Sequence, residues 1–160
     1  MDEKTIRLDR MRYTNYGTSS CFALLAILFN VFYFVSIYRS DVGTYYYTWL
    51  TGLSIIYNLV FMLVVFLCSE GVKSYNFNYS VTMIVMGVLQ IARIFIIPLK
   101  ASTTMLKVNE EERVAMLPAQ HLRVVIFLSV SAFFLIAGGV IGIIKHNKLE
   151  SYKKSLVKTA

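Results

Sequence analysis

The residues most capable of chemistry in this sequence are one cation and three amides in apolar surroundings. Arg93 and Gln90 are three residues apart in the segment GVLQIARIFIIPLK (87–100), and Asn30 and Asn58 lie near the centres of two other apolar segments. A buried arginine needs an anion or a set of acceptors, whereas amides form hydrogen bonds between membrane helices. The four residues therefore predict either interhelical hydrogen bonds that hold a bundle together or a polar pocket or path.

Four apolar segments must position these side chains. Of the 160 residues, 57% are hydrophobic and only 16% are charged, against about 25% charged in a soluble domain. The long apolar segments cover residues 21–38, 46–68, 79–99 and 124–144. Each is close to the ~20 residues that a helix needs to cross a bilayer, where it must pair its own backbone groups. The sequence therefore predicts an all-α integral-membrane four-helix bundle, a single domain over residues 1–160 with a basic tail at 145–160.

The basic residues predict how this bundle is oriented. Four spans place both termini on the same side of the membrane. The two tails and the second loop carry ten Lys and Arg residues, and the first and third loops carry five. The positive-inside rule therefore places both termini in the cytoplasm, although the basic third loop opposes this. The first span is too long for a typical signal peptide and no small-x-small pattern follows it, which indicates an uncleaved anchor.

Arg93 has two alternative arrangements in the third span. It can snorkel to the outer interface near Leu99, or it can point back toward Gln90, the direction that long side chains on helices prefer. The four predicted spans contain no Asp or Glu. A buried Arg93 therefore takes its counter-charge from a loop acid (Asp41 or the glutamates at 110–112), from an acid of a partner subunit, or from a lipid phosphate or anionic solute.

Other patterns argue against several classes of protein. A proton- or cation-coupled carrier usually uses an intramembrane carboxylate, and none is present here. His121 and His146 flank the fourth span at opposite faces, so they cannot jointly bind haem, and no catalytic motif occurs. Cys21 and Cys68 lack the spacing of a zinc or redox site, and packing is the better interpretation of both. We therefore expect no enzyme, cofactor, metal or nucleic-acid partner.

Two further patterns concern packing. Gly138 and Gly142 form a GxxxG motif in the fourth span, which lets two helix backbones approach closely, within the chain or between subunits. The third loop, TTMLKVNEEERVAML (103–117), predicts a short surface helix that Pro118 ends. Such a helix would cap the bundle or bind a partner.

These observations lead to two functional hypotheses, both with membrane lipids as partners. The first is a non-catalytic integral-membrane subunit or scaffold that associates with a larger membrane complex through a protein partner or a second copy. Its basis is the small extramembrane mass, the lack of catalytic groups and the charge of Arg93. The alternative is a small transporter, channel-like or lipid-binding protein with an anion or headgroup site. That site would consist of Arg93, Gln90, Asn58 and Asn30, and an insertase-like polar groove is a variant of it.

Overall fold

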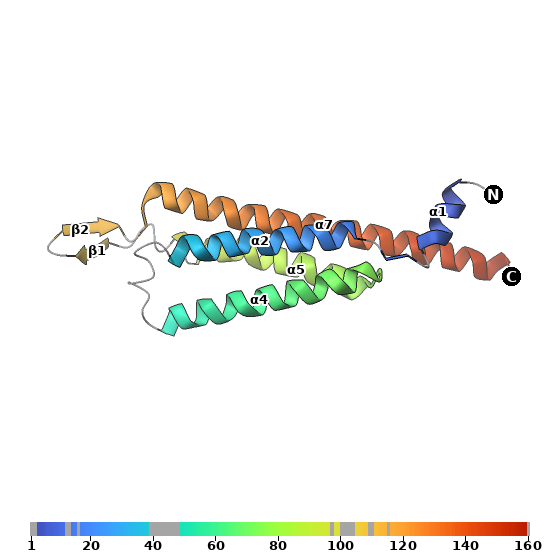
Figure 1. The fold of residues 1–160 in the computed structure, drawn as a ribbon, viewed down its shortest axis with the longest axis horizontal. Coiled ribbons are helices and arrows are strands. Elements are labelled where there is room, and N and C mark those ends of the chain that lie inside the picture. Colours follow the sequence, from blue (N-terminus) through green and yellow to red (C-terminus); the bar gives the residue numbers. More distant parts are fainter. Residues whose placement is uncertain are drawn as a thin grey trace.

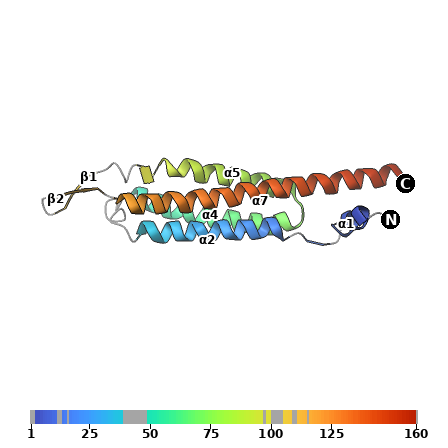
Figure 2. The same ribbon diagram turned by 90° about the horizontal axis from the view of Figure 1, so that it is seen from above.

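Four long helices run side by side along the molecule (Figures 1 and 2). The computed structural model describes residues 3–11, 14–15, 17–38, 49–96, 98–99, 105–108, 111–114 and 116–159. The long helices are α2 (Thr18–Tyr38), α4 (Trp49–Lys73), α5 (Phe77–Ile94) and α7 (Pro118–Thr159). Each is long and apolar enough to cross a membrane. The predicted all-α membrane four-helix bundle is therefore confirmed.

The helix α7 is the longest element and organises the packing of the others. It packs along α5 and α2, and α4 packs against α2 and α5. In Figure 1, α2 and α5 lie between α7 and α4. A short helix, α1 (Glu3–Met11), contacts α7. The two termini lie at the same end of the molecule, as four spans require (Figure 1).

Three spans differ from their predicted bounds by a few residues. α2 begins three residues earlier than predicted, and α4 covers residues 49–73 rather than 46–68. α5 ends at Ile94 rather than at residue 99. A proline ring clashes with the carbonyl four residues before it, so Pro98 prevents the helix from continuing past Ile94.

In the tail predicted at residues 145–160, residues 145–159 are helical. α7 continues past its apolar part and ends at Thr159. Nucleating a helix is costly but extending one is not, and this segment is rich in good helix formers such as Lys and Leu. We call residues 145–159 the α7 extension. At 1.5 Å per residue it is about 22 Å long, and it lies at the end of the molecule where the termini are (Figure 2).

The prediction of a short surface helix in the third loop was wrong. This region contains two antiparallel strands, β1 (Met105–Val108) and β2 (Glu111–Val114). Only two residues separate the strands, and their register places Lys107 opposite Glu112. A two-residue connection is typical of a β-hairpin. Pro118, which was expected to end the helix, instead begins α7, a position that suits its fixed φ angle.

The interior of the bundle is mainly apolar. Besides the site described below, its buried polar residues in the described part of the chain are Ser19, Ser20, Ser69 and Ser80. One buried cluster includes Phe61, Val65, Met83 and Leu135, contributed by α4, α5 and α7. The opposite faces of the spans expose large apolar side chains, such as Leu63 of α4. Lipid tails solvate these faces in a membrane, so their exposure is the expected pattern for spanning helices.

Candidate functional site: a polar cluster around Arg93

A cluster of buried polar side chains lies inside the bundle, and every span contributes to it. Its members, which we call the polar cluster, are Asn30 on α2, Asn58 on α4, Gln90 and Arg93 on α5, and Ser131 on α7. None of them is more than 5% exposed. On α5, Gln90 and Arg93 share one buried face with Met83 and Gly87, because residues three or four apart lie on the same side of a helix.

The guanidinium of Arg93 points inward and binds two amides. Its Nη1 donates to Asn58 Oδ1 at 2.8 Å and, more weakly, to Asn30 Oδ1 at 3.4 Å. Asn30 Nδ2 also donates to Asn58 Oδ1, at 3.3 Å. The amide of Asn58 is oriented for this role because its Nδ2 donates to the carbonyl of Ser54 at 2.9 Å. Both amide oxygens therefore face the cation.

Gln90 connects these residues to α7. Its Nε2 donates to Asn30 Oδ1 at 2.9 Å and to Ser131 Oγ at 3.4 Å. Ser131 Oγ in turn donates to the backbone carbonyl of Ala26 on α2, at 2.9 Å. The hydrogen bonds thus join all four spans at one level, which fixes how far each helix can slide along its neighbours.

Two tyrosine rings complete the surroundings of Arg93. The guanidinium carbon lies 4.3 Å from the ring centre of Tyr33 and 4.8 Å from that of Tyr57. Aromatic faces attract a cation, by up to about 2 kcal/mol when the pair is shielded from water. Two amide oxygens and two aromatic faces therefore lie around the guanidinium.

Only one of these two tyrosines could be associated with the polar residues from its spacing. Tyr33 follows Asn30 by three residues, so it lies on the same face of α2 one turn further along, as Arg93 does relative to Gln90. Tyr57 is adjacent to Asn58, and neighbouring positions on a helix point about 100° apart. Its contact with Arg93 depends on how α4 is rotated in the bundle.

The predicted spans, residues 21–38, 46–68, 79–99 and 124–144, contain no Asp or Glu. Of the loop acids predicted as the counter-charge of Arg93, Asp41 and Glu110 lie outside the described residues, and only the backbone of Glu111 and Glu112 is described. At this site, the buried Gln90 Oε1 and Tyr57 Oη have no hydrogen-bond partner in the described part of the chain. The cluster thus combines a cation with amide and hydroxyl groups, a set that can hold helices together or bind an anion.

The two glycines of the GxxxG motif face helices of the same chain. A Cβ atom at Gly138 would lie 2.8 Å from Met83 Cε and 3.3 Å from the carbonyl oxygen of Ser19. A Cβ atom at Gly142 would meet the hydroxyl of Ser80 on α5. The motif therefore lies at the contacts of α7 with α5 and α2.

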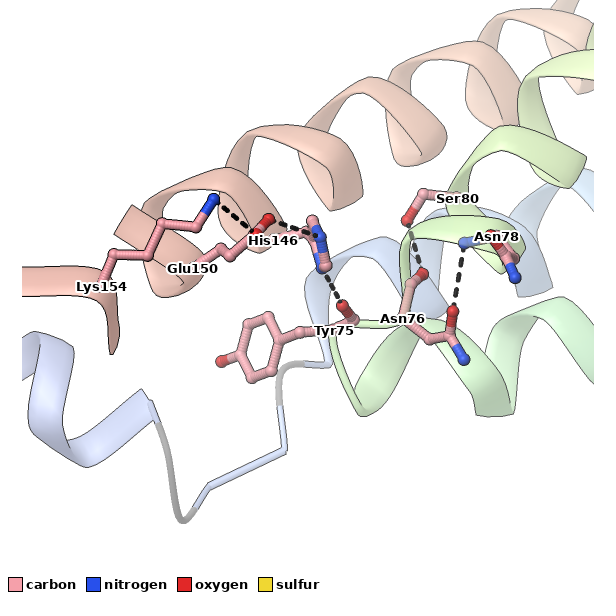
Figure 3. Close-up of polar contacts among 7 residues, drawn as sticks. All are labelled: Tyr75, Asn76, Asn78, Ser80, His146, Glu150 and Lys154. Atoms are coloured by element: carbon pink, nitrogen blue, oxygen red, sulfur yellow. Dashed lines mark hydrogen bonds and ion pairs between the residues drawn. The ribbon is translucent and has the colours of Figure 1, made fainter. Parts of the chain in front are cut away.

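A second group of polar contacts lies near the start of the α7 extension (Figure 3). His146 Nδ1 is 2.6 Å from the backbone carbonyl of Tyr75. A carbonyl only accepts hydrogen bonds, so this nitrogen carries a proton. Tyr75 has a φ of 58°, the left-handed conformation in which many helices end. Its N–H donates to the carbonyl of Val72 at 3.0 Å. Hydrogen bonds therefore bind both the N–H and the carbonyl of Tyr75 in the turn after α4.

The same histidine continues into an ion pair along α7. His146 Nε2 lies 3.4 Å from Glu150, whose other oxygen lies 2.8 Å from Lys154 Nζ. The hydrogen bond and the charge of Lys154 lower the pKa of the Glu150 carboxyl. This contact is therefore present above the ordinary carboxyl pKa and is lost as the pH falls through the lowered value. Glu150 is exposed, so its effect on stability is small.

Replacing His146 is expected to loosen the turn between α4 and α5. His146→Ala leaves the Tyr75 carbonyl without its donor, and a hydrogen bond of this kind contributes about 1 kcal/mol. Hydrogen exchange of amides 72–78 should become faster in the variant, while exchange in the centre of α5 stays unchanged. His146→Asn keeps a donor near the position of Nδ1 and should recover part of the protection. Equal exchange in His146→Ala and the wild type would contradict this role.

Comparisons with known proteins do not identify a relative. Protein-family models, curated proteins and solved structures give no match to this chain. The residues, contacts and charges described above are therefore the basis on which a function is proposed.

Proposed function

We propose that this protein is a non-catalytic integral-membrane subunit or scaffold that associates with a larger membrane complex, with both termini in the cytoplasm. The observation that carries the proposal is that Arg93 and its amide partners are bound to each other inside one chain. These groups join α2, α4 and α5, and Ser131 connects them to α7. Arg93 and the amides include no nucleophile and no acid-base pair. A bundle of this kind is suited to present surfaces to other proteins.

The burial of Arg93 refines where a partner would bind. The side chain is 5% exposed and its guanidinium lies between two tyrosine rings. An acid on a partner helix would reach it only if the bundle opened. We therefore place the partner contact on the outer faces of the bundle or on its extramembrane parts.

Purification of the full chain from its native membrane tests this proposal. The tagged protein is extracted in a mild detergent, and the proteins and lipids that copurify are quantified by mass spectrometry. We expect at least one membrane protein in a fixed ratio to the chain. The same tag on an unrelated four-span protein is the control. A chain that purifies alone, or only with lipid, would overturn the proposal.

A second candidate function is the binding of an anionic solute or lipid headgroup. It is favoured by Tyr57, whose ring centre lies 4.8 Å from the guanidinium carbon and whose buried hydroxyl has no hydrogen-bond partner among the described residues. A cation next to a free hydroxyl donor is a suitable pair for a phosphate or carboxylate. In the same purification, a lone chain that retains one anionic lipid in a fixed ratio would support this function.

A further inference from the structure

The α7 extension (residues 145–159) continues α7 as a helix beyond the four-helix bundle. Among the described elements, α1 contacts α7, and Leu149 is a buried residue of the extension. The start of the extension is held by the contacts of His146 with Tyr75 and Glu150. Because the extension is continuous with a membrane-spanning helix and fixed at this point, its direction is set by the bundle.

The charge of the α7 extension is strongly positive. It contains five lysines and one glutamate. The glutamate, Glu150, is already bound by Lys154. Lys148 and Lys153 are exposed and form no ion pair within the described part of the chain. Five residues at 100° each place these two lysines about 140° apart, so positive charge covers much of the helix circumference.

The position of the lysines argues against lipid as the only target of this charge. If the hydrocarbon core ends at Ile144, then Lys148 lies about 6 Å beyond it and Lys153 about 14 Å beyond it. The headgroup layer is only about 5–8 Å thick, and salt screens charges over roughly 8 Å. Lys148 can therefore reach lipid headgroups. The backbone of Lys153 lies about 6–9 Å past them, roughly one screening length, so its attraction to lipid is weaker. Near the C-terminal end of the extension, Val157 is 79% exposed. Its apolar side chain is therefore available for contact with a partner.

We propose that the α7 extension is a docking arm for an acidic segment of a partner protein. This inference rests on the proposed function and specifies the chemistry of the partner. The basic residues outside the headgroup layer complement acidic side chains. The exposed Val157 offers an apolar contact within such an interface. The fixed start of the arm lowers the entropy lost on binding.

A charge reversal in the full chain tests the docking arm. Lys148→Glu together with Lys153→Glu changes the formal charge of the extension from +4 to zero, counting His146 as neutral. Copurification of the partner from native membranes should fall about tenfold or more at physiological salt, since reversed charges both lose attraction and add repulsion. The matched control, Lys148→Arg with Lys153→Arg, should retain the partner. High salt should release the partner from the wild type.

The possible outcomes separate the inference from the proposed function. If the wild type and the charge-reversed chain retain the partner equally, the docking arm is overturned and the subunit proposal stands. Loss of the partner from the arginine control as well would also overturn it, because charge would not be the cause. A wild type that purifies with an anionic lipid and no protein overturns both. An unchanged unfolding midpoint in all variants, expected for exposed sites, shows that the fold is intact.

Discussion

Asn58→Leu is expected to destabilise the bundle by about 3 kcal/mol. The substitution removes the acceptor that lies 2.8 Å from Arg93 Nη1 and leaves a guanidinium donor facing an apolar side chain. Hydrogen bonds between membrane helices contribute only about 0.6 kcal/mol on average, but a buried charged donor that loses its acceptor costs considerably more. The measurement is unfolding by SDS in mixed micelles, with helix content as the signal.

A double-mutant cycle identifies the charge as the cause. Arg93→Leu removes the cation together with its hydrogen bonds, and replacing a buried ionic group by an apolar one is often close to neutral. Asn58→Leu should therefore cost much less in the Arg93→Leu background than in the wild type. We expect a coupling energy of about 2 kcal/mol between the two sites. Additive effects would show that Asn58 stabilises the bundle without Arg93.

The level of the polar cluster could be predicted from the sequence because it depends on few quantities. Helical rise and the centre of each span place Asn30, Asn58 and Gln90 at the same depth. Lipid offers an amide no partner, so side chains at one depth turn toward each other. The structure has Asn30 within 3.3 Å of Asn58 and within 2.9 Å of Gln90. The direction of Arg93 followed the general preference of side chains on helices.

The parts that could not be predicted depend on tertiary geometry or on weak local signals. The contact of Tyr57 with Arg93 depends on the angle by which α4 is rotated about its own axis. The pattern of polar residues on α4 is compatible with a wide range of such angles. Residues 105–114 contain apolar positions that fit either a short helix or two strands, and short apolar runs do not separate the two. The extent of α7 beyond residue 144 was missed because hydropathy marks where a span ends, not where its helix ends.

A glycine that lies close to a neighbouring backbone was also missed. Gly138 and Gly142 were selected by their GxxxG spacing, but among the described glycines the closest approach to a neighbouring backbone occurs at Gly139. A Cβ atom there would lie 2.7 Å from the carbonyl oxygen of Ser80. At Gly142 the closest obstacle is the hydroxyl of Ser80, which can rotate away, and the Cβ atom of Ser80 would lie at 3.1 Å. Spacing within one helix does not reveal which of the two kinds of atom lies opposite.

Gly139→Ala is therefore expected to destabilise the bundle by about 2 kcal/mol. Overpacking against a backbone atom forces α5 and α7 apart and costs up to about 3 kcal/mol, while the higher helix propensity of alanine returns about 1 kcal/mol. Gly142→Ala should be close to neutral. Rotation of the Ser80 hydroxyl relieves the closest contact, and the helix propensity of alanine offsets the remaining 3.1 Å contact with Ser80 Cβ. The measurement is the SDS unfolding midpoint of each variant.

Val140→Ile is the matched control, since it adds the same single carbon at the next position of α7, on an exposed face. It should leave the midpoint unchanged. If Gly139→Ala were no more destabilising than Val140→Ile, the close contact between α5 and α7 would not exist in the membrane. The polar cluster would then be the main constraint on the position of α7, and Ser131 would be its one contact with that helix. In that case Asn58→Leu should also destabilise the packing of α7. Gly139→Ala and Asn58→Leu together therefore measure how much packing and how much hydrogen bonding contribute to the stability of the four-helix arrangement.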